Sequence, residues 1–95
     1  MQKVNQHPVE KFFISPVNVR PTLANIKEIY SVHSAIARDY LGYTKLLIVT
    51  DNPNQTLAKI ILAIDTSIYR IVKTTTNSQK GTITILLKEK KELLN

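Results

Sequence analysis

Apolar residues recur at steps of three and four in the first half of the chain, which predicts a long helix. The helix begins after Pro21, with Thr22 as its N-cap, and Gly42 stands where a left-handed C-cap residue is wanted. The stripe consists of Leu23, Ile26, Ile29, Tyr30, His33, Ile36, Ala37, Tyr40 and Leu41. The pattern therefore predicts a helix over residues 22–41.

A second helix is predicted to begin at Asn52. Asn52 is a suitable N-cap, Pro53 fits the first helical position, and Gln55 can complete a capping box. Its apolar stripe consists of Leu57, Ile60, Ile61, Ile64 and Ile68. We place the change from helix to strand near Ser67, and a helix that continues to Lys73 remains an alternative.

The remaining apolar runs are rich in β-branched residues and predict strands. The run from Lys45 to Thr50 is continuously apolar at its centre, which favours a central strand covered on both faces. Two further strands, Tyr69 to Thr76 and Thr82 to Lys88, flank the turn residues 77–81 and predict a hairpin. Near the start, residues 12–15 form a short strand candidate. Residues 17–20 lie between two prolines and predict an edge strand or an extended loop.

The predicted element order is β-α-β-α-β-β, an α/β fold with a four-stranded mixed sheet and two helices. Residues 11–90 form a single domain, with a loose lead-in over 1–10 and a charged tail over 91–95. Helical crossovers between parallel strands are right-handed in nearly all cases. If the first three strands run parallel, their carboxyl ends share one edge of the sheet. That edge would then collect the loops at 18–20 and 51–55 and the hairpin tip at 74–81.

Residues suited to catalysis are few. His7 lies in the lead-in, and His33 falls on the apolar stripe, where a structural role is expected. There is no cysteine, no local pair of carboxylates and, with two glycines, no phosphate-cradling loop. We therefore expect a protein that is not an enzyme and that uses no metal, cofactor or small-molecule substrate. The lack of cysteine, of a signal peptide and of a long apolar run leads us to expect a cytoplasmic protein without a membrane role.

The net charge of +6 favours an anionic partner. Lysine and arginine neutralise phosphates, while amides and hydroxyls donate hydrogen bonds to phosphate oxygens. On the predicted edge, the candidate nucleic-acid-binding residues are Asn18, Arg20, Asn54, Gln55, Lys59, Lys73, Asn77 and Lys80. The opposite edge also carries cations, namely Lys11, Lys45, Arg70, Lys88, Lys90 and Lys91. No aromatic residue is interleaved with the cations of the hairpin, so the sequence gives little support to base stacking there.

Several short segments resemble the Alba family of small basic chromatin proteins. Val19-Arg20-Pro21 is similar to a basic pair followed by proline, and Lys59 lies near the place of a lysine in the second helix. The segment 63–66 is similar to the Ala-Val-Asp-Thr of that helix, and 81–90 to the basic closing strand. Where the family has Gly-Arg, this chain has Asn52-Pro53-Asn54. The C-terminal domain of bacterial initiation factor three shares the same predicted element order.

The resemblance implies a homodimer formed through the second helix and the hairpin strands. It also implies largely sequence-independent binding of DNA or RNA by a chromosome-associated protein, with the hairpin arms reaching along the minor groove. The alternative is a protein–protein interaction module in which the charge serves solubility.

Overall fold

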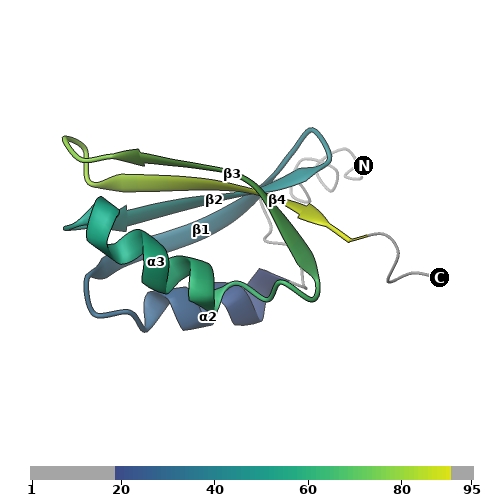
Figure 1. Cartoon of the computed structure of the whole chain (residues 1–95), viewed down its shortest axis with the longest axis horizontal. Helices are drawn as coiled ribbons and strands as arrows, with labels where there is room; N and C mark the ends of the chain where they lie inside the picture. The colour runs from purple at the N-terminus through teal and green to yellow at the C-terminus, as the bar shows by residue number, and fades with distance from the viewer. Residues whose placement is uncertain (1–18, 91–95) are drawn as a thin grey trace, which may run out of the picture.

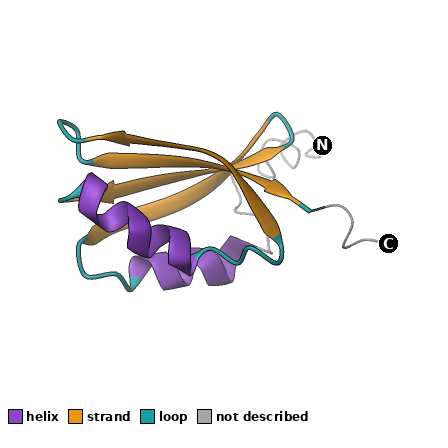
Figure 2. Cartoon of the chain, viewed as in Figure 1, coloured by secondary structure: helices purple, strands orange, loops and turns teal. Residues whose placement is uncertain are grey.

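Two helices lie on one face of a four-stranded antiparallel sheet. The structure is a computed structural model that describes residues 19–90 (Figure 1). The helices are α2 (Arg20–Lys27) and α3 (Pro53–Ala63). The strands are β1 (Val32–Tyr40), β2 (Tyr43–Thr50), β3 (Tyr69–Asn77) and β4 (Thr82–Glu89), in the spatial order β1-β2-β4-β3. Figure 2 shows that both helices pack beneath the same side of the sheet, so within residues 19–90 the other side has no helix over it.

The core lies between the sheet and the helices. Alternate strand residues point into it, as expected for a sheet that is covered on one face. On the two central strands the fully or almost fully buried apolar residues are Leu46, Ile48, Ile83, Ile85 and Leu87. From the helices, Leu23, Ile26 and Ile60 reach the same core. The period of two places the intervening side chains of β2 and β4 on the open face. The edge strands β1 and β3 each contain a register shift, between Val32 and Ser34 and between Ile71 and Lys73.

A small hydroxyl network fixes the start of α3. Thr56 Oγ1 lies 2.8 Å from Ser31 Oγ, and Thr50 Oγ1 donates to Thr56 Oγ1 over 3.2 Å. Both threonines are almost completely buried. The network therefore ties α3 to the end of β2 and to the loop before β1. Buried hydroxyl groups without hydrogen-bond partners would cost free energy, and these hydrogen bonds avoid that cost.

The predicted helix over 22–41 is wrong beyond Lys27. The chain turns at residues 28–31 and then forms β1, in which Ala35 and Ala37 are buried and Ile36 is half exposed. The helical stripe required Tyr30 and Leu41 to be inward-facing, yet their exposed fractions are 102% and 83%. In β1 the alternation is limited to buried Ala35 and Ala37 with their exposed neighbours, and pairing with β2 fixes the segment as a strand. Tertiary pairing thus overrides a local helical pattern.

The β1–β2 turn consists of Leu41 and Gly42, both with positive φ, 52° and 86°. Two such residues are typical of the tight hairpin turn whose twist matches that of the flanking strands. Gly42 therefore has the left-handed conformation that the sequence predicts, but it serves a hairpin and not a helix end.

Several other predictions can be compared with the structure. The helix starting at 52–53, the central position of the 45–50 strand and the hairpin of 69–88 are confirmed. The alternative of a helix running to Lys73 is wrong, because β3 begins at Tyr69. Within residues 19–90, helices cover the central strand β2 on one face and not, as predicted, on both. All strand pairs in this range are antiparallel, so the prediction of a mixed sheet is also wrong. The predicted strand at 12–15 lies outside the described residues, and Arg20 begins α2 instead of ending an extended segment.

Replacing Leu41 by asparagine is expected to stabilise the fold by about 1 kcal/mol. A leucine with φ near +52° pays a steric penalty that asparagine largely avoids. Urea unfolding at constant pH measures the difference in free energy of unfolding. Leu41→Ala is the matched control, since it removes the exposed side chain but keeps the penalty at Cβ. Equal stability of the Asn and Ala variants would contradict the argument.

Tyr69 makes stability sensitive to alkaline pH. Its side chain is buried, and burial together with the negative charges of Glu89 and Asp39 raises its pKa, while a hydrogen bond with Thr44 acts in the opposite direction. Because the folded-state pKa lies above the unfolded value of about 10, the stabilisation is complete below that pH and is lost as pH rises through the folded-state pKa.

We therefore expect Tyr69→Phe to lose less stability than the native chain as pH rises above about 10. The measurement is the free energy of unfolding of both proteins between neutral and strongly alkaline pH. At neutral pH, where Tyr69 is uncharged, the loss of the Thr44 hydrogen bond should lower the stability of the variant. Parallel curves over the whole range would refute a role for Tyr69 ionisation.

Candidate nucleic-acid interface

The open face of the sheet carries a cluster of cations at one end. Antiparallel pairing places Arg38 opposite Lys45, Lys45 opposite Leu86, and Leu86 opposite Lys73, so that these residues form one row across all four strands. In the neighbouring row, Tyr40 is opposite Tyr43 and Arg70 is opposite Lys88. We call this cluster the basic sheet face; it consists of Arg38, Tyr40, Tyr43, Lys45, Arg70, Lys73 and Lys88.

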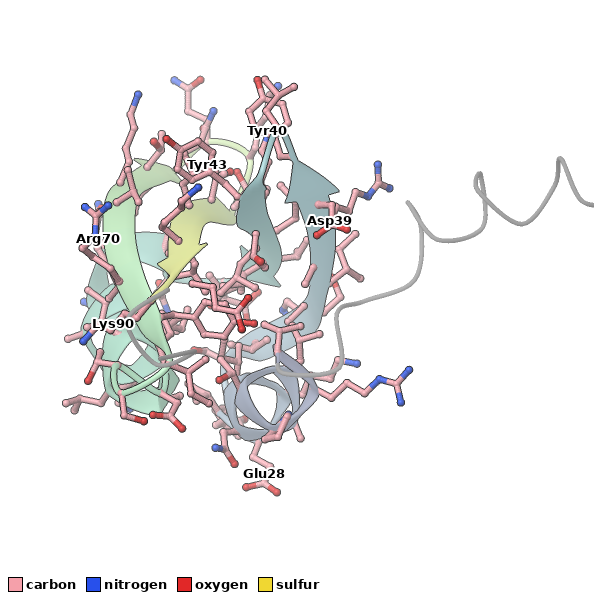
Figure 3. All side chains as sticks on the ribbon, turned by 90° about the vertical axis from the view of Figure 1, so that its right-hand side faces the viewer. Glu28, Asp39, Tyr40, Tyr43, Arg70 and Lys90 are labelled. Atoms are coloured by element: carbon pink, nitrogen blue, oxygen red, sulfur yellow. The ribbon has the colours of Figure 1, made fainter. Side chains whose placement is uncertain are left out.

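Each tyrosine of the basic sheet face lies under a lysine. The Lys45 Nζ atom is 4.8 Å from the centre of the Tyr40 ring, and the Lys88 Nζ atom is 4.8 Å from the centre of the Tyr43 ring. Both distances lie within the range of cation–π attraction. Figure 3 shows Tyr40 and Tyr43 on the side of the sheet away from Glu28 and α2. The Leu41–Gly42 turn brings the two rings together, because it joins strands of which they are the terminal pair.

Charge on the sheet is sorted by face. Of the ten lysines and arginines between residues 19 and 90, five lie on the basic sheet face. The five acids in the same range occupy loops or core-side strand positions; they are Glu28, Asp39, Asp51, Asp65 and Glu89. The two on strands are assigned by register, because Asp39 pairs with buried Thr44 and Glu89 pairs with buried Tyr69. In the described part of the chain, the open face therefore has cations and no acid.

A hollow of about 180 Å³ lies within this face. It is lined by an aromatic ring, an aliphatic side chain, two hydroxyl groups and two lysines. These belong to Tyr40, Lys45, Lys73, Thr75, Thr84 and Leu86. All four strands contribute to the lining, so the hollow forms only when the sheet is assembled.

The sequence predicts that the start of the second helix and the hairpin tip lie together, and they do. Asn54 Nδ2 donates to Ser78 Oγ over 3.1 Å, and Thr76 Oγ1 donates to Asn54 Oδ1 over 3.0 Å. Asn77 Oδ1 accepts the backbone N–H of Lys80 over 3.0 Å. The strands β2 and β3 are both antiparallel to β4, so they run in the same direction and their carboxyl ends share an edge although they are not adjacent.

This edge lacks the electrostatics of a phosphate site. The hollow between α3 and the hairpin is lined by Asn52, Pro53, Asn54, Gln55 and Ser78 together with Asp51, and no lysine or arginine lines it. Asp51 Oδ1 lies 2.7 Å from His33 Nε2. Asn54 and Asn77 already hydrogen-bond neighbouring groups of the chain. The hydrogen bonds of Asn54 thus stabilise the junction of α3 with the hairpin.

The other predicted site residues are not brought together. Arg20 begins α2, and Figure 1 places that start toward the end of the sheet with the β1–β2 turn, whereas Lys80 lies in the β3–β4 turn at the opposite end. Lys59 is an exposed residue of α3, in the helical layer, and Lys73 belongs to the open face. Asn18 lies outside the described residues. The surface expected to join Arg20 with Lys80 does not form.

The sequence reasoning missed the two tyrosines and the role of Arg38. It assigned residues 32–41 to a helix, which hid the alternation of Arg38 and Tyr40 with core-facing neighbours. It also treated Lys45, Arg70 and Lys88 as charges on an opposing edge. The spacing of Arg38, Tyr40, Tyr43 and Lys45 around a Leu-Gly turn is a signal that could have indicated a hairpin with a shared basic and aromatic face.

Between residues 19 and 90, no group of three or more metal-binding side chains is found, and no helix is long and apolar enough to cross a membrane. Comparison with protein-family models, curated proteins and solved structures gives no significant match. A functional proposal for this chain therefore depends on the geometry of its own surface.

Proposed function

We propose that this protein binds nucleic acid, with little dependence on sequence, through the basic sheet face. Its five cations would contact phosphate groups, which carry no sequence information directly. The proposal keeps the phosphate neutralisation expected from the sequence but moves it from the loop-and-hairpin surface to the open face of the sheet. Lys73 is common to both surfaces.

The observation that carries the proposal is the pairing of like charges across the strands. Arg38 lies directly opposite Lys45, and Arg70 lies directly opposite Lys88. Directly opposed like charges destabilise an antiparallel pair. An anion that binds between them removes this repulsion. Two such pairs on one face favour a role for the cations beyond solubility.

The extent of the basic sheet face suits a polyanion. The row from Arg38 to Lys73 crosses three gaps between strands, a distance of about 14 Å at about 4.8 Å per gap. Each strand of B-DNA carries one phosphate per about 3.4 Å of helix axis, so the row can reach more than one of them. A second copy of this chain would bring the same positive charges face to face, which opposes self-association through this surface.

The homodimer implied by the family resemblance stays a prediction. The buried side of α3, which includes Thr56 and Ile60, packs within the same chain, as does Ile64 directly after the helix. Leu62 is an exposed large apolar residue on the outer side of this helix. A dimer through α3 would therefore use Leu62 and its polar neighbours and not the main apolar stripe.

Affinity for nucleic acid is expected to fall with salt, and replacing face cations should flatten that dependence. The slope of log K against log salt is near −0.9 per phosphate contact on duplex DNA and near −0.7 on single strands. Lys45→Gln and Lys73→Gln should each reduce the magnitude of this slope by about 0.7–0.9, which corresponds to the loss of one phosphate contact. Fluorescence anisotropy of a labelled oligonucleotide at several salt concentrations gives the slope.

Lys27→Gln and Lys59→Gln are the matched controls, because they remove the same charge from exposed helical positions. If the controls reduce the slope as much as the face variants do, binding depends on total charge and not on the basic sheet face. If random duplex DNA and single-stranded RNA both fail to shift in a gel at low salt and micromolar protein, the protein–protein interaction module becomes the better explanation.

Relief of like-charge repulsion should make Arg38→Thr more stable than the native chain in the absence of ligand. Threonine is favourable in strands, and loss of the repulsion opposite Lys45 is expected to raise the free energy of unfolding by up to about 1 kcal/mol. The gain should shrink at high salt, where screening weakens the repulsion. Urea unfolding at low and high salt, with Lys59→Gln as the charge control, measures it. Lower stability of Arg38→Thr at low salt would count against the proposed strain.

A further inference from the structure

We infer that the nucleic acid recognised by the basic sheet face is single-stranded, and that an unpaired base occupies the hollow beside Tyr40. This inference rests on the proposed function and adds the class of ligand. It follows from features of the face that phosphate binding alone does not require. These features are two adjacent tyrosine rings and a hollow with an aliphatic floor.

The chemistry of the hollow fits a base better than a phosphate. Tyr40 and Leu86 offer apolar surface, which would be wasted on a phosphate group but can cover the face of a planar ring. Thr75 and Thr84 supply hydroxyl groups that can donate to or accept from the edge of a base. At about 180 Å³, the hollow is smaller than the roughly 300–1,000 Å³ of typical pockets for drug-sized ligands, which suits a single small ring system.

The tyrosine rings can stack only with bases that are accessible. In a duplex, each base face is covered by its neighbours in the stack, and a protein contacts base edges in the grooves. Proteins that bind single strands instead combine basic surfaces with aromatic side chains on which bases stack. The side chain of Tyr40 is about half exposed, at 48%. Its ring is therefore available to a base without rearrangement of the strand.

The two tyrosine–lysine pairs can each serve one nucleotide. Lys45 and Lys88 keep their ammonium groups 4.8 Å from the ring centres of Tyr40 and Tyr43. A base stacked on the ring would bring its own phosphate close to that ammonium, and the flexible lysine stem allows the charge to move from the ring to the phosphate. Because Tyr40 and Tyr43 are a directly opposed pair, two successive nucleotides could use the two units side by side.

The test compares oligonucleotides of one length and composition in three forms: single-stranded DNA, single-stranded RNA and duplex DNA. Anisotropy titrations at fixed salt should show tighter binding to one or both single strands than to the duplex. Tyr40→Leu keeps an apolar residue suited to an exposed strand position but cannot stack. It should weaken single-strand binding by roughly 5-fold to 150-fold, given about 1–3 kcal/mol per stacked base, and weaken duplex binding much less.

Three further variants guard against an indirect effect. Tyr40→Phe retains the ring and should restore single-strand affinity, whereas Tyr43→Leu should weaken it as Tyr40→Leu does. Tyr30→Leu is the matched control, since Tyr30 is a fully exposed tyrosine in the loop between α2 and β1. Circular dichroism melting shows whether each variant is folded. Because the chain has four tyrosines and no tryptophan, quenching of its intrinsic fluorescence by single strands also reports stacking directly.

The outcomes separate the two proposals. One outcome is that duplex and single strands bind equally, that neither Tyr40→Leu nor Tyr43→Leu has a selective effect, and that Lys45→Gln and Lys73→Gln still weaken binding. In that case the proposed function holds and the single-strand inference is overturned. If no oligonucleotide binds at low salt, both are overturned. Binding to vesicles of anionic lipid in the absence of binding to any oligonucleotide also overturns both and would assign the face to membranes.

Discussion

The burial of one face of the central β2–β4 pair is the constraint on which the rest of this structure depends. Leu46 and Ile48 of β2 and Ile83 and Ile85 of β4 are almost completely excluded from solvent beneath the two helices. Since side chains alternate along a strand, the residues between them must point to the other side. Lys45 and Lys88 are therefore on the open face because their neighbours belong to the core. The proposed binding surface is a direct consequence of core packing.

The proposed face carries charge that the fold alone would not favour. Two cation pairs oppose each other across the strands, and Leu41 at the adjoining turn has a backbone conformation that leucine seldom adopts. Natural proteins often retain such locally unfavourable features where function needs them. The opposed cations and the Leu41 turn lie together at one end of the sheet. This coincidence agrees with a functional role for that end.

The opposite end of the sheet has a different character. There the amide of Asn54, the hydroxyls of Thr76 and Ser78, and the Thr50–Thr56 pair connect α3 to the hairpin and to β2. Gly81 completes this junction. A Cβ atom at its position would lie 2.8 Å from the Thr50 carbonyl oxygen, which is closer than van der Waals contact allows. Asn54, Thr76 and Ser78 form part of the binding surface expected from the sequence or lie next to it. In the structure they hydrogen-bond one another and hold α3 against the sheet.

The sequence by itself determined the elements whose signals are local. Pro53 after Asn52 marks the start of α3, the β-branched run of 45–50 marks a central strand, and turn residues at 77–81 mark the last hairpin. It could not determine the structure of 32–41, because the apolar residues there follow a helical period and, within β1, only Ala35 and Ala37 are buried. The choice was made by hairpin pairing with β2 across the Leu41–Gly42 turn, which places Ala35 and Ala37 against the core. The location of the candidate site followed from that choice, since Arg38 and Tyr40 join Lys45, Lys73 and Lys88 only when four strands from distant parts of the chain lie side by side.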